Sequence, residues 1–92
     1  MMGQLYILDG KTPVPFFDTT KWGLQVDKII GKDQFGSVSV STVFLGIDHS
    51  FGGGDPVLFE TMIFGGEHDQ YQERYCTWDE AEKGHQIACD LV

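Results

Sequence analysis

Basic residues are scarce in this sequence: six Lys and Arg stand against fourteen Asp and Glu, and the formal net charge is −8. A surface this acidic repels phosphate groups, so we expect no direct binding to nucleic acid and favour a partner with a basic surface. Cysteine is also rare. Cys76 and Cys89 are too few for the disulfide framework of a small secreted protein, which points to a reducing compartment.

Long apolar runs are missing as well, and so is the pattern of a targeting segment. No stretch approaches the ~20 apolar residues that a membrane helix needs. The N-terminal residues before Lys11 carry no basic side chain and only a short apolar run, unlike a signal or transit peptide. We therefore expect a cytoplasmic protein without a membrane partner.

The chain has the length and the composition of one folded domain, residues 1–92. Ninety-two residues lie near the lower size limit for folding without disulfides or metals. Hydrophobic residues make up 41% of the chain and include seven Phe, three Tyr and two Trp, too many for a disordered protein. No internal repeat or low-complexity segment divides the sequence.

The clearest strand pattern surrounds a glycine-rich segment, residues 48–56. Residues 38–47 alternate in character and end with apolar side chains on both faces, which is typical of a central strand in a covered sheet. Residues 57–64 continue after the segment, so we expect these two strands to pair as a hairpin. Shorter strands are predicted at residues 4–8, 28–34 and 71–76.

Two prolines and a helix-capping pattern follow the first predicted strand. Pro13 and Pro15 are expected to break regular strand pairing, because proline has no N–H for the ladder. Asp18 and Thr19 are typical of the start of a short helix containing Trp22.

The C-terminal residues predict a helix. Thr77-Trp78-Asp79-Glu80 matches a capping box, in which the Thr77 hydroxyl and the Glu80 carboxylate each accept a bond from the other's amide. Apolar and small residues then recur at helical spacing and form one stripe. The stripe consists of Trp78, Ala81, His85, Ala88 and Val92. The predicted fold class is α+β, an antiparallel sheet of four to five strands with this helix packed on one face.

Five side chains of metal-ligand type lie in the loop of the predicted hairpin or beyond its second strand: Asp48, His49, Asp55, His68 and Asp69. Asp48 and Asp55 are expected at one end of the hairpin and His68 beyond the other, about 25 Å away for strands of this length. One ion cannot bridge that separation, so we assign no metal ligand. Asp48 and Asp55 are interpreted as turn residues beside glycines.

Two further features suggest chemistry and also have structural explanations. Gly52-Gly53-Gly54 offers backbone amides to an anion, but a strand follows where a phosphate loop has a helix, and the loop's lysine is missing. These glycines are interpreted as loop residues with positive φ. Glu60, which lies among apolar neighbours, is typical of an acid or base with a raised pKa, and pairing with Arg74 or Lys83 is the favoured interpretation.

Cys76 precedes the predicted helix, where a thiolate is stabilised, and His85 is the candidate base. His85 lies about two helical turns further along, too far for a direct bond. Cys76 and Cys89 are therefore interpreted as small core residues. We assign no catalytic residue and no cofactor.

Four segments resemble a family of small proteins encoded in bacteriophage and prophage genomes. They lie within residues 41–85, about half of the chain, and are Ser41–His49, Phe51–Gly52, Leu58–Gly66 and Arg74–His85. The resemblance implies a viral or mobile-element setting in the cytoplasm of a bacterial host. It brings no catalytic residue with it.

The charge and the resemblance together favour a non-catalytic protein that binds another protein. A small acidic phage-type protein is expected to antagonise host defence, as anti-CRISPR proteins do, by occupying a basic surface that otherwise binds nucleic acid. The expected contacts are Glu67, Asp69, Glu73, Asp79, Glu80 and Glu82. One alternative is a small metal-dependent hydrolase that uses Asp48, His49 and Glu60. Another is a virion or accessory domain that forms a homodimer through exposed aromatic residues.

Overall fold

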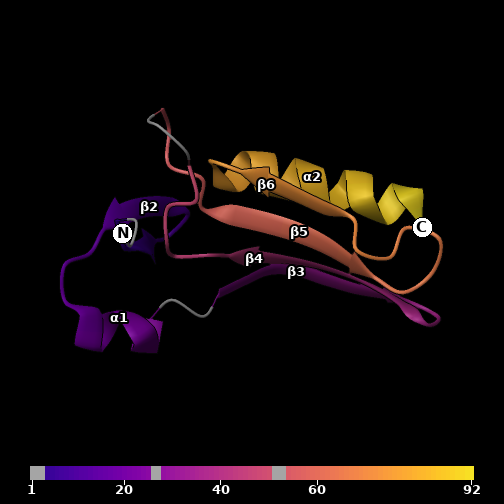
Figure 1. Cartoon of the computed structure of the whole chain (residues 1–92), viewed down its shortest axis with the longest axis horizontal. Helices are drawn as coiled ribbons and strands as arrows, with labels where there is room; N and C mark the ends of the chain where they lie inside the picture. The colour runs from indigo at the N-terminus through magenta and orange to yellow at the C-terminus, as the bar shows by residue number, and fades with distance from the viewer. Residues whose placement is uncertain (1–3, 26–27, 51–53) are drawn as a thin grey trace.

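The computed structural model describes residues 4–25, 28–50 and 54–92. In these residues the chain forms a two-stranded sheet, a four-stranded sheet and two helices (Figure 1). In chain order the elements are β1 (Tyr6–Asp9), β2 (Thr12–Pro15), α1 (Thr19–Gln25), β3 (Lys28–Phe35), β4 (Val38–Phe44), β5 (Phe59–Phe64), β6 (Gln72–Tyr75) and α2 (Trp78–Leu91).

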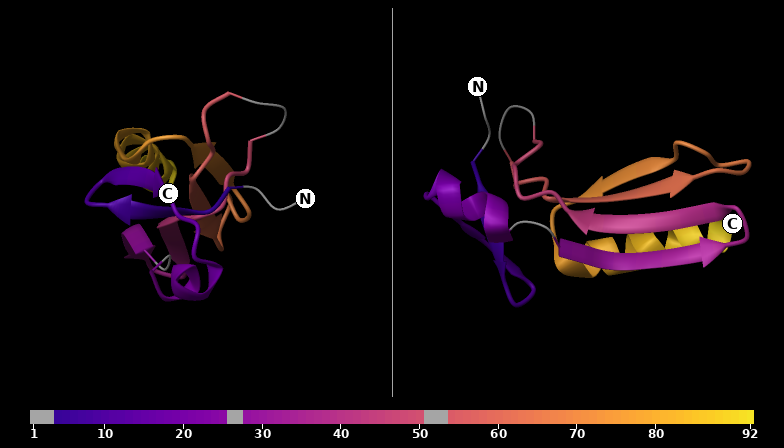
Figure 2. Two further views of the ribbon diagram at one scale, coloured as in Figure 1. Left: turned by 90° about the vertical axis from the view of Figure 1, so that its left-hand side faces the viewer. Right: turned by 90° about the horizontal axis from the view of Figure 1, so that it is seen from below.

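The larger sheet has the strand order β3-β4-β5-β6, and each neighbouring pair is antiparallel. α2 lies across one face and contacts all four strands, as Figure 1 shows. The β1–β2 hairpin and α1 lie at one end of this sheet (Figure 2). The predicted α+β class, with a C-terminal helix packed on a four-stranded antiparallel sheet, is therefore confirmed.

β4 is a central strand, as its sequence predicts, and pairs with β5 as the predicted hairpin. Val40, Thr42 and Phe44 are buried beneath α2, while Ser41 and Val43 point to the opposite face and are only half-buried. The strand therefore has one covered face. The expectation that both faces would be covered arose from the apolar residues that follow Phe44, and these lie beyond the end of the strand.

Two clusters of buried side chains hold α2 against the sheet. In the first, the Phe59 ring lies 5.4 Å from that of Phe44 and meets Trp78 edge-on at 6.4 Å between centroids. Such tilted and edge-on pairs are favourable arrangements of aromatic rings. In the second, Val40 and Ile63 pack against Ala88. The clusters lie under different parts of the helix and so anchor it along its length.

α2 begins with the predicted capping box. The Thr77 hydroxyl accepts a bond from the Glu80 amide at 3.1 Å, and the Glu80 carboxylate accepts one from the Thr77 amide at 3.1 Å. The buried positions of the helix are Ala81, Gly84 and Ala88, all small residues. Small side chains let the helix lie close to the sheet.

The prediction that Pro13 and Pro15 break strand pairing is wrong. Both residues belong to β2, where Pro13 lies opposite Leu8 and Pro15 opposite Tyr6. Residues two apart in a strand direct their amide positions to the same side. β2 is an edge strand, so both missing N–H groups can face away from β1, where no ladder bond is lost.

The central hairpin strands are shorter than predicted. β4 ends at Phe44 and not at Ile47, because Gly46 adopts a positive φ of 77° that turns the chain away from the sheet. Ile47 instead forms an isolated bridge with Leu5. This contact ties the β1 region to the end of the sheet.

The face of the sheet opposite α2 is not covered by another helix or strand of the described residues (Figure 2). Ile29 and Phe64 are exposed on this face, at 60% and 44% of their surface. Neither helix that the structure describes is long and apolar enough to span a membrane.

Candidate functional site

The predicted turn residue Asp48 organises the loop that leaves β4. One carboxylate oxygen accepts bonds from the amides of Ser50 at 2.8 Å and Val57 at 2.9 Å, and the other accepts from the Ser50 hydroxyl at 3.0 Å. These bonds, led by the Ser50 amide, lower the pKa of Asp48. The neighbouring His49 donates through Nδ1 to the carbonyl of Ile47 at 2.7 Å when that nitrogen is protonated. Asp48 therefore closes the loop, in agreement with its interpretation as a turn residue.

The pKa of Asp48 predicts a pH-dependent contribution to stability. Its ionised form is favoured in the folded state, so this contribution is complete above the unfolded pKa of about 3.9 and disappears as pH falls through the lower folded pKa. We expect Asp48→Asn to lower the free energy of unfolding by about 1 kcal/mol at neutral pH, since this loop is partly screened by solvent. Urea titrations should show the difference from wild type shrinking below about pH 4.

Asp55→Asn is the matched control for this change, because the Asp55 side chain is exposed. It should alter stability at neutral pH by less than about 0.5 kcal/mol. A difference between Asp48→Asn and wild type that stays constant down to pH 2 would contradict the assignment.

The glycine segment of the loop lies partly outside the described residues, which exclude 51–53. The interpretation of Gly52 and Gly53 as loop residues, and the anion-binding alternative, lie outside the described residues. Gly54 has a φ of 93°, in agreement with its interpretation as a loop residue with positive φ.

Glu60 lies on the sheet face opposite α2 and is paired, as predicted, with Arg74. The Arg74 Nε donates to its carboxylate at 2.8 Å, and the Gln72 amide donates to the same oxygen at 2.5 Å. Glu60 and Arg74 are directly opposite in the β5–β6 register, which brings the pair together across strands. The carboxylate is thus held by a cation in a structural arrangement.

Cys76 and His85 have separate partners. The Cys76 thiol faces the Asp55 carbonyl oxygen at 3.8 Å, and burial raises the pKa of Cys76. A raised pKa disfavours the thiolate that a nucleophile needs. His85 bonds to other residues, so the two do not form a nucleophile and base.

The six acidic residues predicted to bind a partner are all exposed. Glu67 and Asp69 lie in the turn between β5 and β6, Glu73 lies in β6, and Asp79, Glu80 and Glu82 lie in the first turns of α2. The structure brings the three helical residues together. The two turn residues lie beyond the opposite end of β6, near the C-terminal end of α2 (Figure 1). The six residues therefore form a band and not a compact cluster.

Three residues of this band also have partners within the chain. Asp69 accepts a bond from the Gly65 amide at 2.7 Å, Glu80 belongs to the capping box, and Glu82 lies 3.7 Å from the Lys11 ammonium. These three stabilise the turn, the helix start and the contact with the β1–β2 hairpin. Glu67, Glu73 and Asp79 have no hydrogen bond or ion pair to another side chain of residues 4–25, 28–50 and 54–92.

A polar chain that the sequence did not predict crosses from β3 to the middle of the sheet beneath α2. The His85 Nε2 lies 2.7 Å from the Asp33 carboxylate on β3, and its Nδ1 lies 2.6 Å from the Thr42 hydroxyl on β4. That hydroxyl is 2.5 Å from the hydroxyl of Thr61 on β5. Both threonines are fully buried, so the chain satisfies polar groups that would otherwise be costly in a core.

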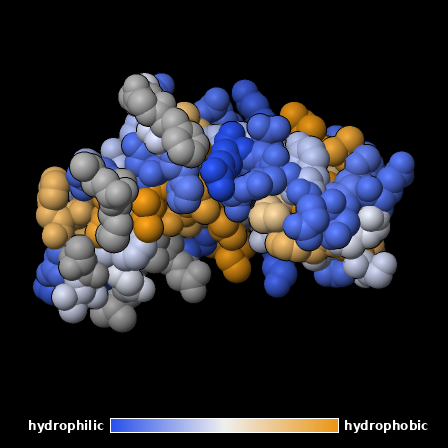
Figure 3. Space-filling view, viewed as in Figure 1, coloured by the Kyte–Doolittle hydropathy of each residue, from blue (hydrophilic) through white to orange (hydrophobic). Residues whose placement is uncertain are grey.

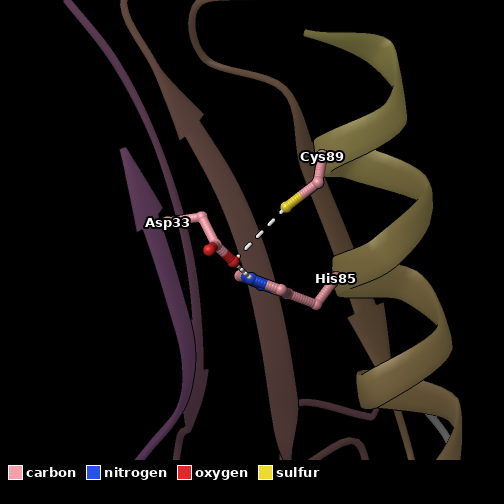
Figure 4. Close-up of side chains that lie close together, drawn as sticks. All are labelled: Asp33, His85 and Cys89. Atoms are coloured by element: carbon pink, nitrogen blue, oxygen red, sulfur yellow. Dashed lines mark hydrogen bonds and ion pairs between the residues drawn. The ribbon is translucent and has the colours of Figure 1, made fainter. Parts of the chain in front are cut away.

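Cys89 lies one helical turn after His85 and completes a cluster with it and Asp33 (Figure 4). Its sulfur is 3.6 Å from the Asp33 carboxylate. The bond from His85 is the main cause that lowers the pKa of Asp33. Burial, with the Asp33 carboxylate adding to it, raises the pKa of the Cys89 thiol to about 11. Three ligand atoms thus meet between β3 and α2.

Part of this cluster could have been found in the sequence. His85 and Cys89 are four residues apart in a predicted helix, and such pairs share a face. Asp33 could not have been added, because the register of β3 shifts at a bulge between Ile29 and Gly31. A bulge changes which residues of a strand face the helix.

The Tyr75 hydroxyl lies in the interior, beside the polar chain of Asp33, His85, Thr42 and Thr61. The hydroxyl is buried without a hydrogen bond of good geometry among the described residues. Burial raises the pKa of Tyr75, and the nearby Thr61 hydroxyl partly opposes that rise. The ring packs so closely against Gly84 of α2 that no Cβ fits there.

Comparisons with known protein families, curated proteins and solved structures found no match.

Proposed function

We propose that this protein acts by binding a basic surface of another protein and not by catalysis. In the phage-type setting that its sequence resembles, the partner would be a host-defence protein, and the bound protein would compete with nucleic acid, as anti-CRISPR proteins do. The observation that carries the proposal is the acidic band from the β5–β6 turn along β6 to the start of α2, in which all six residues are exposed.

The net negative charge of the C-terminal part of the chain supports the proposal. From residue 67 to the C-terminus, seven acidic residues stand against only Arg74 and Lys83. Figure 3 shows hydrophilic side chains over much of the visible side that carries β6 and α2. A surface with one dominant sign attracts an oppositely charged partner over distance and accelerates association.

Glu67, Glu73 and Asp79 are the residues best placed for a partner. Their carboxylates have no other side chain to neutralise them among the described residues, whereas Asp69, Glu80 and Glu82 also have partners within the chain. We therefore expect Glu67 and Glu73, which are not needed for the helix cap, to contribute to association without contributing to stability.

The charge-reversed variant Glu67→Lys/Glu73→Lys tests this proposal. Wild type and variant serve as baits in parallel purifications from a bacterial host lysate, at low and at moderate salt. A partner bound through the acidic band should be retained by wild type at low salt, and the variant should retain at least about tenfold less of it. Binding by wild type should also weaken as salt rises, because ions screen exposed charges.

The matched control is Asp9→Lys/Asp55→Lys, which changes the net charge equally at two exposed acids outside the band. This control should retain nearly the wild-type amount of the partner. Equal weakening by both variants would show that only the total charge matters. Failure of wild type to retain any nucleic-acid-binding protein at low salt would argue against the proposal.

A further inference from the structure

Asp33, His85 and Cys89 bring an oxygen, a nitrogen and a sulfur ligand to one point between β3 and α2. Their ligand atoms all lie within 4.8 Å of one another. Figure 4 shows the three side chains converging from two elements, with the His85 ring and the Cys89 sulfur both directed at the Asp33 carboxylate. No residue of the predicted acidic band belongs to this cluster.

We propose that these three residues bind one divalent transition-metal ion, with Zn²⁺ as the best fit. Carboxylate, imidazole and thiolate are the three side-chain ligands that Zn²⁺ uses in proteins. Three protein ligands leave a fourth position of a tetrahedral ion for water. This site goes beyond the proposed binding function and does not depend on it.

The distances suit such an ion after a small adjustment. With bonds of about 2.0–2.1 Å to nitrogen and oxygen and about 2.3 Å to sulfur, tetrahedral ligand atoms lie about 3.3–3.6 Å apart. The Asp33 oxygen is 3.6 Å from the Cys89 sulfur and 2.7 Å from the His85 Nε2. Of these two separations, only the one between Asp33 and His85 must widen; the His85 Nε2 and the Cys89 sulfur lie within 4.8 Å of one another. The Asp33 side chain is 53% exposed, so it is free to move outward and admit the ion and its water.

The interior side of the cluster already orients the imidazole. Thr42 lies 2.6 Å from the His85 Nδ1, the nitrogen that does not face Asp33. Metal-binding histidines usually donate their second N–H to such a partner, which directs the other nitrogen at the ion. The ring also lies close to Gly31, where a Cβ would come within 3.0 Å of it. Thr42 and Gly31 are thus positioning residues.

The Thr42 hydroxyl, which is paired with that of Thr61, can hydrogen-bond to the His85 imidazole with and without the ion. When Nε2 carries the proton and bonds to Asp33, the Thr42 hydroxyl donates to Nδ1 and accepts from Thr61. When the ion occupies Nε2, the imidazole proton lies on Nδ1 and is donated to Thr42, whose hydroxyl turns to Thr61. Either hydroxyl of this pair can be the donor. The Cys89 thiol proton passes to solvent as the sulfur binds.

The ligand set also defines which ions are excluded. Mg²⁺ and Ca²⁺ prefer oxygen ligands, and only Asp33 supplies one here. Co²⁺ takes the same tetrahedral geometry as Zn²⁺ and reports on its ligands by colour, so it is the probe of choice. Coordination by a thiolate gives a charge-transfer band in the near ultraviolet.

Titration of the reduced protein with Co²⁺ tests the site. We expect saturation at one ion per chain, a thiolate-to-cobalt band, intense visible bands of tetrahedral Co²⁺, and loss of colour when Zn²⁺ is added but not Mg²⁺. Cys89→Ser should abolish the thiolate band, and Asp33→Asn should weaken binding at least about tenfold. Thr42→Val, which touches no ion, should weaken binding by about 10–100-fold while keeping the thiolate band.

Cys76→Ser is the matched control, since Cys76 is the other cysteine and lies outside the cluster. It should bind Co²⁺ with the wild-type affinity and spectrum. Circular dichroism of each ion-free variant checks that it is folded. The proposal is overturned if wild type binds no stoichiometric Co²⁺, or if the thiolate band persists in Cys89→Ser and disappears in Cys76→Ser.

Discussion

Replacing Gly84 with alanine is expected to destabilise the protein by about 1–2 kcal/mol, although alanine is the better helix former. In the middle of a helix, Gly→Ala usually stabilises by about 1 kcal/mol. At Gly84 a Cβ would overlap the ring and hydroxyl of Tyr75. Overpacking of this kind typically costs about 1–3 kcal/mol, and here either the buried Tyr75 ring or the whole of α2 must move.

Gly23→Ala is the matched control for this prediction. Gly23 lies in α1, and a Cβ there would meet no atom within 4 Å. This change should therefore stabilise the protein by about 0.5–1 kcal/mol. Urea denaturation of both variants measures the two free energies of unfolding. A Gly84→Ala protein as stable as wild type would mean that α2 is not packed on Tyr75 as described.

Replacing Thr42 with valine is expected to lower the free energy of unfolding by about 2–3 kcal/mol. Valine has nearly the same shape, so the change removes the hydroxyl without opening a cavity. It leaves both the Thr61 hydroxyl and the His85 Nδ1 without their partner, in the interior of the protein. A buried polar group without a hydrogen bond costs about 1–3 kcal/mol.

Thr61→Val distinguishes the loss of one hydrogen bond from the burial of a polar group without a partner. Thr61→Val should cost only about 1 kcal/mol, because Thr42 keeps its bond to His85. The double variant should be no less stable than Thr42→Val alone, because it removes the hydroxyl that Thr42→Val leaves stranded. This gives an interaction energy of about 1 kcal/mol in a double-mutant cycle.

Thr12→Val serves as the control for this cycle. Thr12 is an exposed residue of β2, and its replacement should change stability by less than about 0.5 kcal/mol. If the effects of Thr42→Val and Thr61→Val on the free energy of unfolding were strictly additive, the buried hydrogen bond between the two threonines would be contradicted.

Local features of the sequence determined the elements and much of their arrangement. The capping box at Thr77 and Glu80 involves residues three apart, so the start of α2 can be predicted from residues close in sequence. The alternation around Val40 and Thr42 likewise placed these two residues on the same face of β4. The paired state of Glu60 was also predictable, because a carboxylate among apolar side chains needs a counter-charge.

Only the tertiary structure decided which polar residues meet. Asp33 and His85 are 52 positions apart, and their contact depends on the bulge in β3 and on where α2 crosses the sheet. The acceptance of Pro13 and Pro15 in β2 depends in the same way on that strand lying at an edge. Periodicity specifies the face of an element but not its partner, because register and crossing geometry arise from packing between distant segments.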